Sequence, residues 1–534
     1  MRTRARAVAL ASTIALLAQG GCKPLATQAP QDGDAPLRLV VLVVIDQWPT
    51  WGFEARRDLY AHGLKRMMDE GVVYPEAEYP YVITFTAPGH ATLGTGAPPS
   101  STGIVANGWW RREQGRERQA EADDTVTILP LPGRSSEGIE GASGAPLRVD
   151  GIADVLRRET GGKARSVVIG GKARAACLVA GRRPDVALWY EPKLVGMTSS
   201  TAYGDELPAW ALTLDRERPV APYLDDVWTT DDAALLRTRT GIPDDAAGEG
   251  AEHGLGITFP YALASSTSPA KALRATPFLD RIEVDAAVAA VTGEQLGADD
   301  IADLLVVSLS AHDFVGHNWG QESWEMIEHE RALDRELGRL LSFLDERVGA
   351  DRYAVLVTSD HGATPVIERG RHPGARRIPP AELEAAAEEA AATVLGPGDW
   401  VAALSSAMVY LSPAALARAP RDRDAALAAI TARLSTIPNI ARVIALDTLP
   451  SSCAGLDELT TRACLTRFAG ETGDLLVIPT DGSLITSYTT GTSHDAPSAD
   501  TRLVPLLVRI PGSSLTPRPI SILSVAPTLA TLLR

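Results

Sequence analysis

Two short motifs that combine aspartate with histidine each follow an apolar, strand-like run of this sequence. They are Asp313-Phe-Val-Gly-His317 and Asp360-His361-Gly362. In open α/β sheets, ligands bind at the edge of the sheet where the carboxyl ends of the strands meet. Carboxylate and imidazole together are ligands that suit Zn²⁺. Two such motifs in one chain therefore suggest an enzyme with two metal ions.

Asp46 and His494 extend the set of candidate metal ligands to six. Asp46 ends another apolar run, Val43-Val-Ile-Asp46, and His494 lies far along the chain in a loop-like segment. Six side chains make two sets of three, and each set leaves the open coordination position that catalytic zinc needs. Two zinc ions about 3.5–4 Å apart can clamp the attacking and leaving oxygens of a phosphoryl transfer. Taken singly, each residue is explained as well by a helix cap, a turn or a surface histidine, so the interpretation depends on the combination.

Thr86 is the candidate nucleophile. It stands before Ala87-Pro88 at the start of a helix-compatible run, where threonine is a good N-cap and proline is tolerated in the first turn. The positive end of such a helix would favour an alkoxide on Thr86. Thr84 is the rival nucleophile, but it lacks the cap position. A threonine that only caps the helix is the alternative interpretation of this segment.

Three further side chains could bind a phosphoryl group. Asn107 can donate an amide N–H to a phosphate oxygen, and Lys172 and Arg174 follow an apolar run. Because they are two residues apart, Lys172 and Arg174 would point to one side of an extended chain. A lysine and a planar arginine fork suit the nonbridging oxygens of a transferred phosphoryl group. Without the other residues, a solvated basic pair explains them equally well.

The elements that must position these residues are apolar strands and amphipathic helices that alternate along the chain. A helical pattern at 324–348 and a final one at 521–533 are the clearest helices. Near-continuous apolar runs suit strands that are covered on both faces, as in a parallel sheet. The alternation predicts an α/β fold with a doubly wound, mostly parallel sheet and helices on both faces. The strand-like runs lie at 37–45, 166–169, 304–310, 353–359, 474–478 and 503–510.

The 534 residues divide by composition into a leader, a tether and one large domain. Residues 1–22 have the basic start and short apolar stretch of an export signal, and residues 23–36 read as a flexible tether. Residues 37–534 form the predicted catalytic domain. Within this domain, residues 380–470 contain enough helical and strand-like patterns to form an inserted α+β cap. Residues 131–147 have the composition of a loop.

The net charge and the cysteines indicate which partners and which cellular compartment suit this protein. A formal net charge of −16 disfavours binding to nucleic acid. Cys22 follows two glycines, as at a lipoprotein cleavage site, although Gln19 departs from that pattern. We therefore expect an exported, periplasmic protein with a possible lipid anchor on Cys22. Cys453 and Cys464 flank a short polar segment and are a candidate disulfide in an oxidising compartment, whereas Cys177 reads as a buried thiol.

In order and context, these residues together resemble the alkaline phosphatase superfamily, and within it the PafA-type periplasmic phosphate monoesterases. The resemblance covers nearly the whole chain after the leader and implies a monomeric enzyme with two Zn²⁺ and a phosphothreonine intermediate on Thr86. It assigns phosphate binding to Asn107, Lys172 and Arg174. It assigns the metal ligands to two sets: Asp313, His317 and His494 for one zinc, and Asp46, Asp360 and His361, with Thr86, for the other.

Two other functions share parts of this pattern. The related nucleotide pyrophosphatases/phosphodiesterases have the same metal ligands, threonine and asparagine. The Lys-x-Arg pair is not expected in those enzymes. The presence of Lys172 and Arg174 therefore decides between a phosphate monoester and a diester as the predicted substrate. A non-catalytic lipoprotein that binds metal or phosphate is the second alternative, although no ligand and no nucleophile is missing. A sulfatase is disfavoured because Thr86 and His90 stand where those enzymes need Cys or Ser and Arg.

Overall fold

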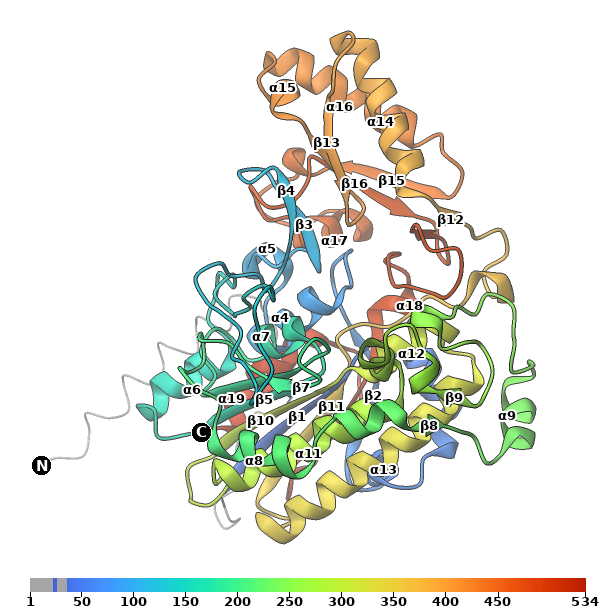
Figure 1. Cartoon of the computed structure of the whole chain (residues 1–534). Coiled ribbons are helices and arrows are strands. Elements are labelled where there is room, and N and C mark those ends of the chain that lie inside the picture. The colour runs from blue at the N-terminus through green and yellow to red at the C-terminus, as the bar shows by residue number, and fades with distance from the viewer. Residues whose placement is uncertain (1–22, 26–35) are drawn as a thin grey trace, which may run out of the picture.

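The computed structural model describes residues 23–25 and 36–534 (Figure 1). The predicted export signal, Cys22 and most of the predicted tether lie outside the described residues. Across the described part of the chain, no helix has both the length and the apolar character that a membrane span requires.

A nine-stranded sheet forms the centre of the described chain, in the order β19-β2-β18-β11-β1-β10-β5-β6-β7. The five strands from β11 to β6 in this order run parallel to one another. Antiparallel neighbours flank them, because β18 pairs antiparallel with β11 and with β2, and β7 pairs antiparallel with β6. The structure thus confirms an α/β fold with a mostly parallel sheet. The strands are β1 (Leu39–Ile45), β2 (Val72–Glu78), β5 (Ser166–Gly170), β6 (Val186–Glu191), β7 (Gly196–Thr198), β10 (Asp303–Leu309), β11 (Tyr353–Thr358), β18 (Leu503–Arg509) and β19 (Ile520–Ser521).

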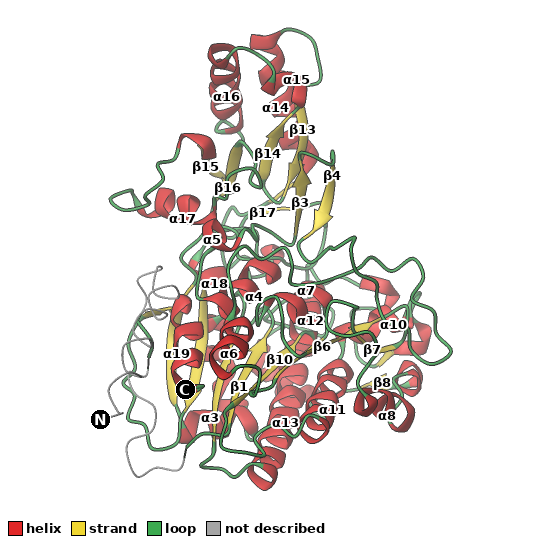
Figure 2. Ribbon diagram, turned by 90° about the vertical axis from the view of Figure 1, so that its left-hand side faces the viewer, coloured by secondary structure: helices red, strands yellow, loops and turns green. Residues whose placement is uncertain are grey.

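Helices cover both faces of this sheet (Figure 2). All seven residues of β1 are buried, which explains why its sequence is continuously apolar rather than alternating. One face carries the pair formed by the long helices α11 and α13, and the other carries the cluster around α4. The first group is α3 (Gly63–Glu70), α11 (Pro277–Gly293) and α13 (Trp324–Arg347), and the second is α4 (Thr86–Thr95), α6 (Ile152–Thr160), α7 (Ala173–Leu178) and α19 (Val525–Leu532).

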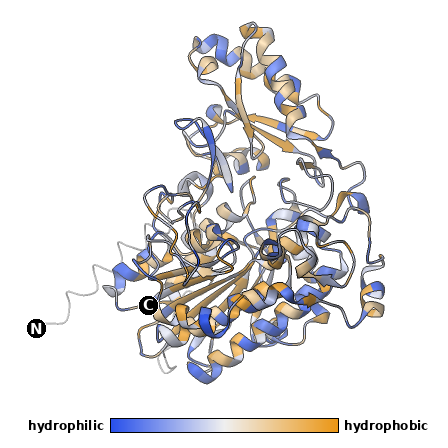
Figure 3. Cartoon of the chain, in the orientation of Figure 1, coloured by the Kyte–Doolittle hydropathy of each residue, from blue (hydrophilic) through white to orange (hydrophobic). Residues whose placement is uncertain are grey.

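A second, four-stranded sheet with the order β13-β14-β16-β15 stands apart from the central sheet, at the top of Figure 1. Helices α14 and α16 pack against each other over it and share a separate apolar core with its strands. Figure 3 shows apolar residues along the strands of both sheets. The elements are α14 (Pro380–Leu395), β13 (Val401–Ser405), β14 (Met408–Leu411), α15 (Pro413–Leu416), α16 (Pro420–Leu434), β15 (Ile440–Ala445), α17 (Glu458–Thr466) and β16 (Leu475–Pro479).

A β-hairpin made of β3 (Gly108–Arg111) and β4 (Arg116–Gln119) reaches from the central domain toward the four-stranded sheet (Figure 1). The hydroxyl of Ser405 donates to Oε2 of Glu117 at 2.9 Å, and the hydroxyl of Ser406 donates to the carbonyl of Gly108 at 2.8 Å. The hairpin is therefore hydrogen-bonded to the end of β13 and to the residue that follows it, through Gly108 at its base and Glu117 in β4.

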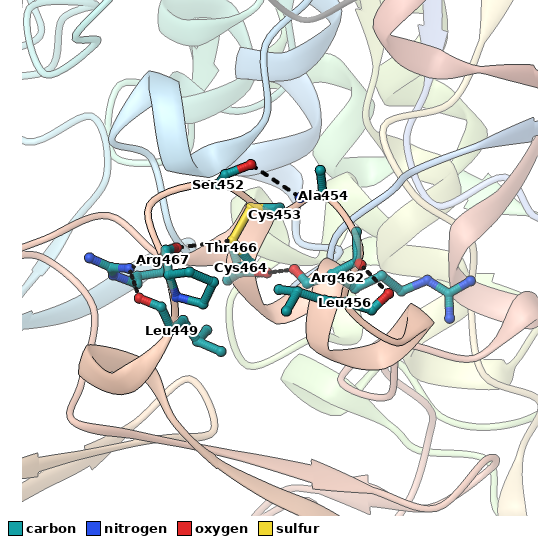
Figure 4. The surroundings of a disulfide bond; sticks show 11 residues. Leu449, Ser452, Cys453, Ala454, Leu456, Arg462, Cys464, Thr466 and Arg467 are labelled. Atoms are coloured by element: carbon teal, nitrogen blue, oxygen red, sulfur yellow. Dashed lines mark hydrogen bonds between the residues drawn. A yellow bond between two sulfur atoms is a disulfide. The ribbon is translucent and has the colours of Figure 1, made fainter.

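Cys453 and Cys464 form a disulfide, with their Cα atoms 5.7 Å apart, as their spacing led us to expect (Figure 4). The bond ties α17, which contains Cys464, to the loop before it. Cys177 is buried, again as expected.

Candidate active site

The six predicted metal ligands meet at one edge of the central sheet. Asp46 directly follows β1, and the pair Asp360 and His361 follows β11 by one residue. Asp313 and His317 lie on α12 (Ala311–Trp319), which follows β10, and their spacing of four residues places them on one face of that helix. His494 arrives from the loop that precedes α18 (Ala499–Arg502). Parallel neighbours β11, β1 and β10 thus bring three separate parts of the chain together.

Two groups of three side chains place their ligand atoms within 4.8 Å of one another. The first group is Asp46, Asp360 and His361, the residues that the family resemblance assigns to one zinc together with Thr86. The second group combines Asp313 and His494 with His361 rather than with His317. Nε2 of His317 nevertheless lies 3.1 Å from Oδ1 of Asp313, so the ring adjoins the second group.

The chemistry of these donors fits divalent zinc. Oδ1 of Asp46 is buried, and no described residue donates a hydrogen bond to it, which is costly for a carboxylate unless a cation binds it. The three histidine ligands share one orientation. Each places Nδ1 against a backbone carbonyl, which leaves Nε2 to face the centre of the site. The carbonyls are those of Gly362 for His361 (2.9 Å), Thr492 for His317 (2.7 Å) and Thr84 for His494 (2.7 Å).

Burial and mutual repulsion govern the charges of these groups. Burial and the nearby carboxylate of Asp360 raise the pKa of Asp46 well above its usual range. Burial lowers the pKa of His361, and burial together with the ring of His361 lowers the pKa of His494. Neutral imidazoles and ionised carboxylates are the forms that bind a metal cation. The lowered pKa values of His361 and His494 therefore favour binding, whereas the raised pKa of Asp46 means that its ionised form needs a cation beside it.

Thr86 begins α4 and lies among these ligands. Its Oγ1 is 3.4 Å from Nε2 of His361. The N-cap position belongs to Phe85, so Thr86 is the first residue of the helix rather than its cap, a correction of one residue to the sequence interpretation. Thr84 is less suitably placed, because its hydroxyl donates to the carbonyl of His494 at 3.3 Å.

The chain path around Thr86 depends on a close approach of two backbones. A Cβ atom on Gly89 would lie 2.2 Å from the carbonyl oxygen of Asp360. The glycine of the Thr-x-Pro-Gly-His segment therefore lets α4 pack directly on the loop that contains Asp360 and His361. This contact places the candidate nucleophile next to the ligands.

Asn107, Lys172 and Arg174 lie beside Thr86. The carbonyl oxygen of the Asn107 side chain accepts from the N–H of Ala87 at 2.8 Å, which leaves its Nδ2 as the donor for a substrate. Nζ of Lys172 lies 2.7 Å from Oδ2 of Asp46 and 2.5 Å from Oδ2 of Asp313. Lys172 is the N-cap residue of α7 and Arg174 lies in its first turn, so the pair does not form the extended segment expected from its spacing.

One cavity of about 530 Å³ contains the side chains of these four residues. Two metal-site residues, Asp313 and His317, and four aromatic side chains also line it. A cavity of this size can hold a small ligand, with Thr86 and the cationic side chains on its wall beside the aromatic side chains. The lining includes Thr86, Asn107, Lys172, Arg174, Phe314 and Tyr488.

Several residues that the sequence did not single out support this site. Gln47 has a φ of 63° directly after Asp46 and donates from Nε2 to Oδ1 of Asp313 at 2.8 Å. His312 places Nδ1 2.9 Å from the carbonyl of Asp46. His90 places Nδ1 2.8 Å from the carbonyl of Thr86. The only sequence signal for these residues is their position next to a ligand or to the nucleophile.

Comparison with known proteins agrees with this geometry. Residues 40–501 match the model of the type I phosphodiesterase / nucleotide pyrophosphatase family. The alkaline phosphatase PafA of Elizabethkingia meningoseptica is 30% identical over 93% of this chain and 91% of its own length. The alkaline phosphatase PhoV of Synechococcus elongatus is 31% identical over 64% of this chain and 62% of its own length.

Solved structures show the same relationship. The crystal structure of wild-type PafA matches with a TM-score of 0.85 and 27% identity, over 93% of this chain and 96% of that chain. Murine ectonucleotide pyrophosphatase/phosphodiesterase 5 shares the fold, with a TM-score of 0.51 and 14% identity over 93% of this chain and 95% of that chain. This chain therefore belongs to the type I phosphodiesterase / nucleotide pyrophosphatase family, as a PafA-like phosphoester hydrolase of the alkaline phosphatase superfamily.

Proposed function

We propose that this protein is an exported, two-zinc phosphate monoesterase that forms a phosphothreonine on Thr86. The observation that carries the proposal is the presence of Lys172 and Arg174 in the cavity that contains Thr86. A monoester presents three nonbridging oxygens, whereas a diester has one of them blocked by its second ester group. Two cationic side chains beside the nucleophile therefore favour the dianionic monoester. The disulfide between Cys453 and Cys464 supports export to an oxidising compartment.

In this mechanism Thr86 attacks phosphorus, the bond to the leaving alcohol breaks, and water then hydrolyses the phosphothreonine. Nδ2 of Asn107, the ammonium of Lys172 and the guanidinium of Arg174 hold the phosphoryl oxygens in both steps. Positioning and charge stabilisation supply most of the rate enhancement, as expected for a loose phosphoryl-transfer transition state. The helix N-terminus at Thr86 adds a favourable potential for negative charge at its oxygen.

The two ligand groups would hold the two zinc ions. Asp46, Asp360 and His361, with Thr86, would hold one, and Asp313, His317 and His494 would hold the other. Zinc supplies Lewis acidity, which lowers the pKa of a bound hydroxyl and neutralises charge on the attacking and leaving oxygens. His361, assigned to the first set, also lies next to the second, because its ring stacks on that of His494 with centroids 3.7 Å apart.

A phosphodiesterase or nucleotide pyrophosphatase is the second candidate. It is favoured by the family model, whose description names those activities. The same ligands and the same threonine would serve a diester equally well. The two activities differ in what Lys172 and Arg174 contribute.

The deciding experiment compares an aryl phosphate monoester with the corresponding diester on purified, zinc-loaded protein. We expect a kcat/KM for the monoester that is orders of magnitude higher. Lys172→Ala and Arg174→Ala should each lower the monoester kcat/KM by about 10- to 100-fold, the usual effect of losing a charged hydrogen bond, and should affect the diester much less. The exposed residue Lys193, which binds the carbonyl of Gly138, provides the control Lys193→Ala. A preference for the diester, or equal losses on both substrates, would refute the monoesterase proposal.

A further inference from the structure

The β3–β4 hairpin contacts the phosphate-binding residues in two places. It is directly connected to Asn107, because β3 begins at the next residue, Gly108, and the N–H of Ala120 donates to the carbonyl of Asn107 at 2.9 Å. Gly108 pairs with Gln119 across the hairpin. Asn107, Gln119 and the residues just after β4 therefore form one hydrogen-bonded unit.

The second contact is with Arg174. Nη2 of Arg174 donates to Oε1 of Gln119 at 3.0 Å, and Nε lies 3.8 Å from Oε1 of Glu121. Glu121 is buried, lines the same cavity as Arg174, and has an Oε2 to which no described residue donates a hydrogen bond. Burial raises the pKa of Glu121, and the nearby guanidinium of Arg174 opposes that rise by attracting the ionised carboxylate.

We infer that Gln119 and Glu121 are positioning residues that hold the guanidinium of Arg174 toward the substrate and so set the preference for phosphate monoesters. The inference depends on the proposed monoesterase function. Arg174 lies in the first turn of α7 and its side chain is 27% exposed. A long side chain with that freedom adopts many rotamers, and a planar fork recognises phosphoryl oxygens only in the correct orientation.

Lys172 is held differently. Its ammonium contacts Asp46 and Asp313, which belong to the metal groups. The hairpin therefore acts on one of the two cations and not on the other. This difference makes a specific prediction about which double variants behave additively.

The test measures the ratio of monoester to diester kcat/KM in zinc-loaded variants. Gln119→Ala should lower this ratio by about tenfold, and Glu121→Gln by a smaller factor, because each removes one contact to a charged group. In an Arg174→Ala background the same changes should alter the ratio by less than about twofold, whereas in a Lys172→Ala background they should keep their full effect. Gln119→Glu, which retains an acceptor for Arg174, should preserve the ratio.

Two controls complete the design. Glu113→Gln, at an exposed position in the turn of the same hairpin, should not change the ratio. Thermal unfolding of each variant identifies any loss of folded protein. Unchanged ratios in Gln119→Ala and Glu121→Gln, or the same fall in the Arg174→Ala background, would overturn the positioning role while leaving the monoesterase proposal intact. A wild-type protein that prefers the diester would overturn both.

Discussion

Oγ1 of Thr86 lies 3.4 Å from Nε2 of His361. Because Nδ1 of His361 faces the carbonyl of Gly362 at 2.9 Å, Nε2 is the nitrogen that faces the two metal groups. Thr86, the first residue of α4, thus lies beside His361, the residue that belongs to both groups. The hydroxyl of Thr86 and Nε2 of His361 would therefore both be available to one metal ion.

This contact predicts that Thr86 alone carries the covalent phosphate. Thr86→Ala should abolish labelling of the protein by a radioactive monoester and lower kcat by about three orders of magnitude or more, as removal of a nucleophile commonly does. Labelling is measured after acid quenching and gel separation. Thr84→Ala is the matched control and should still be labelled, since Thr84 bonds to the carbonyl of His494. Loss of labelling in Thr84→Ala with retention in Thr86→Ala would reverse the assignment.

The shared position of His361 predicts an unequal loss of zinc among ligand variants. Asp46→Asn should retain about one zinc per chain, because Asp46 belongs to one group only. His361→Ala should retain less than that, because His361 is a ligand in one set and its ring also stacks on His494 of the other, with ring centroids 3.7 Å apart. The metal content of dialysed protein is measured by mass spectrometry. Zinc should also raise the melting temperature of the wild type, because an ion that binds only the folded state stabilises it. Two zinc ions in His361→Ala would contradict the arrangement.

The disulfide should stabilise the protein without affecting turnover. Cys453 and Cys464 are 11 residues apart, and closing a loop of that size stabilises a protein by about 3 kcal/mol. Replacing both with Ser should lower the free energy of unfolding in urea by about that amount, while kcat at 25 °C stays within about twofold because neither residue lines the cavity. A reductant should destabilise the wild type but not the double variant. Equal sensitivity of the two proteins would show that the bond is not responsible.

Acid should weaken a buried ion pair beneath the site. Nε and Nη2 of Arg56 donate to the carboxylate of Glu330 at 2.7 and 2.6 Å, and both side chains are buried. Burial alone would raise the pKa of Glu330, but the attraction and hydrogen bonds of Arg56 outweigh it and lower the pKa from 4.5 to about 2. The ionised carboxylate therefore stabilises the folded state at pH above about 4.5, and this contribution is lost as the pH falls toward 2.

Glu330→Gln should accordingly cost about 3–5 kcal/mol of unfolding free energy at pH 7, because it leaves a buried guanidinium without its counter-ion. The difference from the wild type should shrink as the pH falls below 4.5. Urea unfolding of the zinc-free proteins at pH 7 and pH 3 measures it without the pH dependence of metal binding. A difference that grows on acidification would have the wrong sign for a depressed carboxyl pKa.

The sequence predicted the central strands well because burial on both faces leaves a direct signature. The apolar runs around Leu39, Leu304 and Tyr353 became β1, β10 and β11. The strands beyond β11 could not be predicted in the same way. The run at 503–510 has the same composition, yet β18 pairs antiparallel with β11. Strand β2 contains Pro75, Glu76 and Glu78 and is only partly buried, so it gives no continuous apolar signal.

The candidate site, too, could be predicted from the sequence only in part. Residues with metal-ligand chemistry stand out by type, and the strand ends place them. Gln47, Gln119 and Glu121 act through hydrogen bonds or ion pairs to residues that are distant in sequence, such as Asp313 and Arg174. Nothing in a glutamine or glutamate by itself indicates such a partner. Only the folded chain shows the pairing.

The four-stranded sheet lies in the chain between His361 and His494. The group Asp46, Asp360 and His361 is therefore complete once about two-thirds of the chain has been made, whereas the group that needs His494 is complete only after the chain has passed through that sheet and returned. The two groups thus differ in the order in which a chain emerging from its N-terminus can assemble them. The residues of the first group are all present in a chain that is two-thirds made, whereas those of the second are all present only when synthesis is nearly finished.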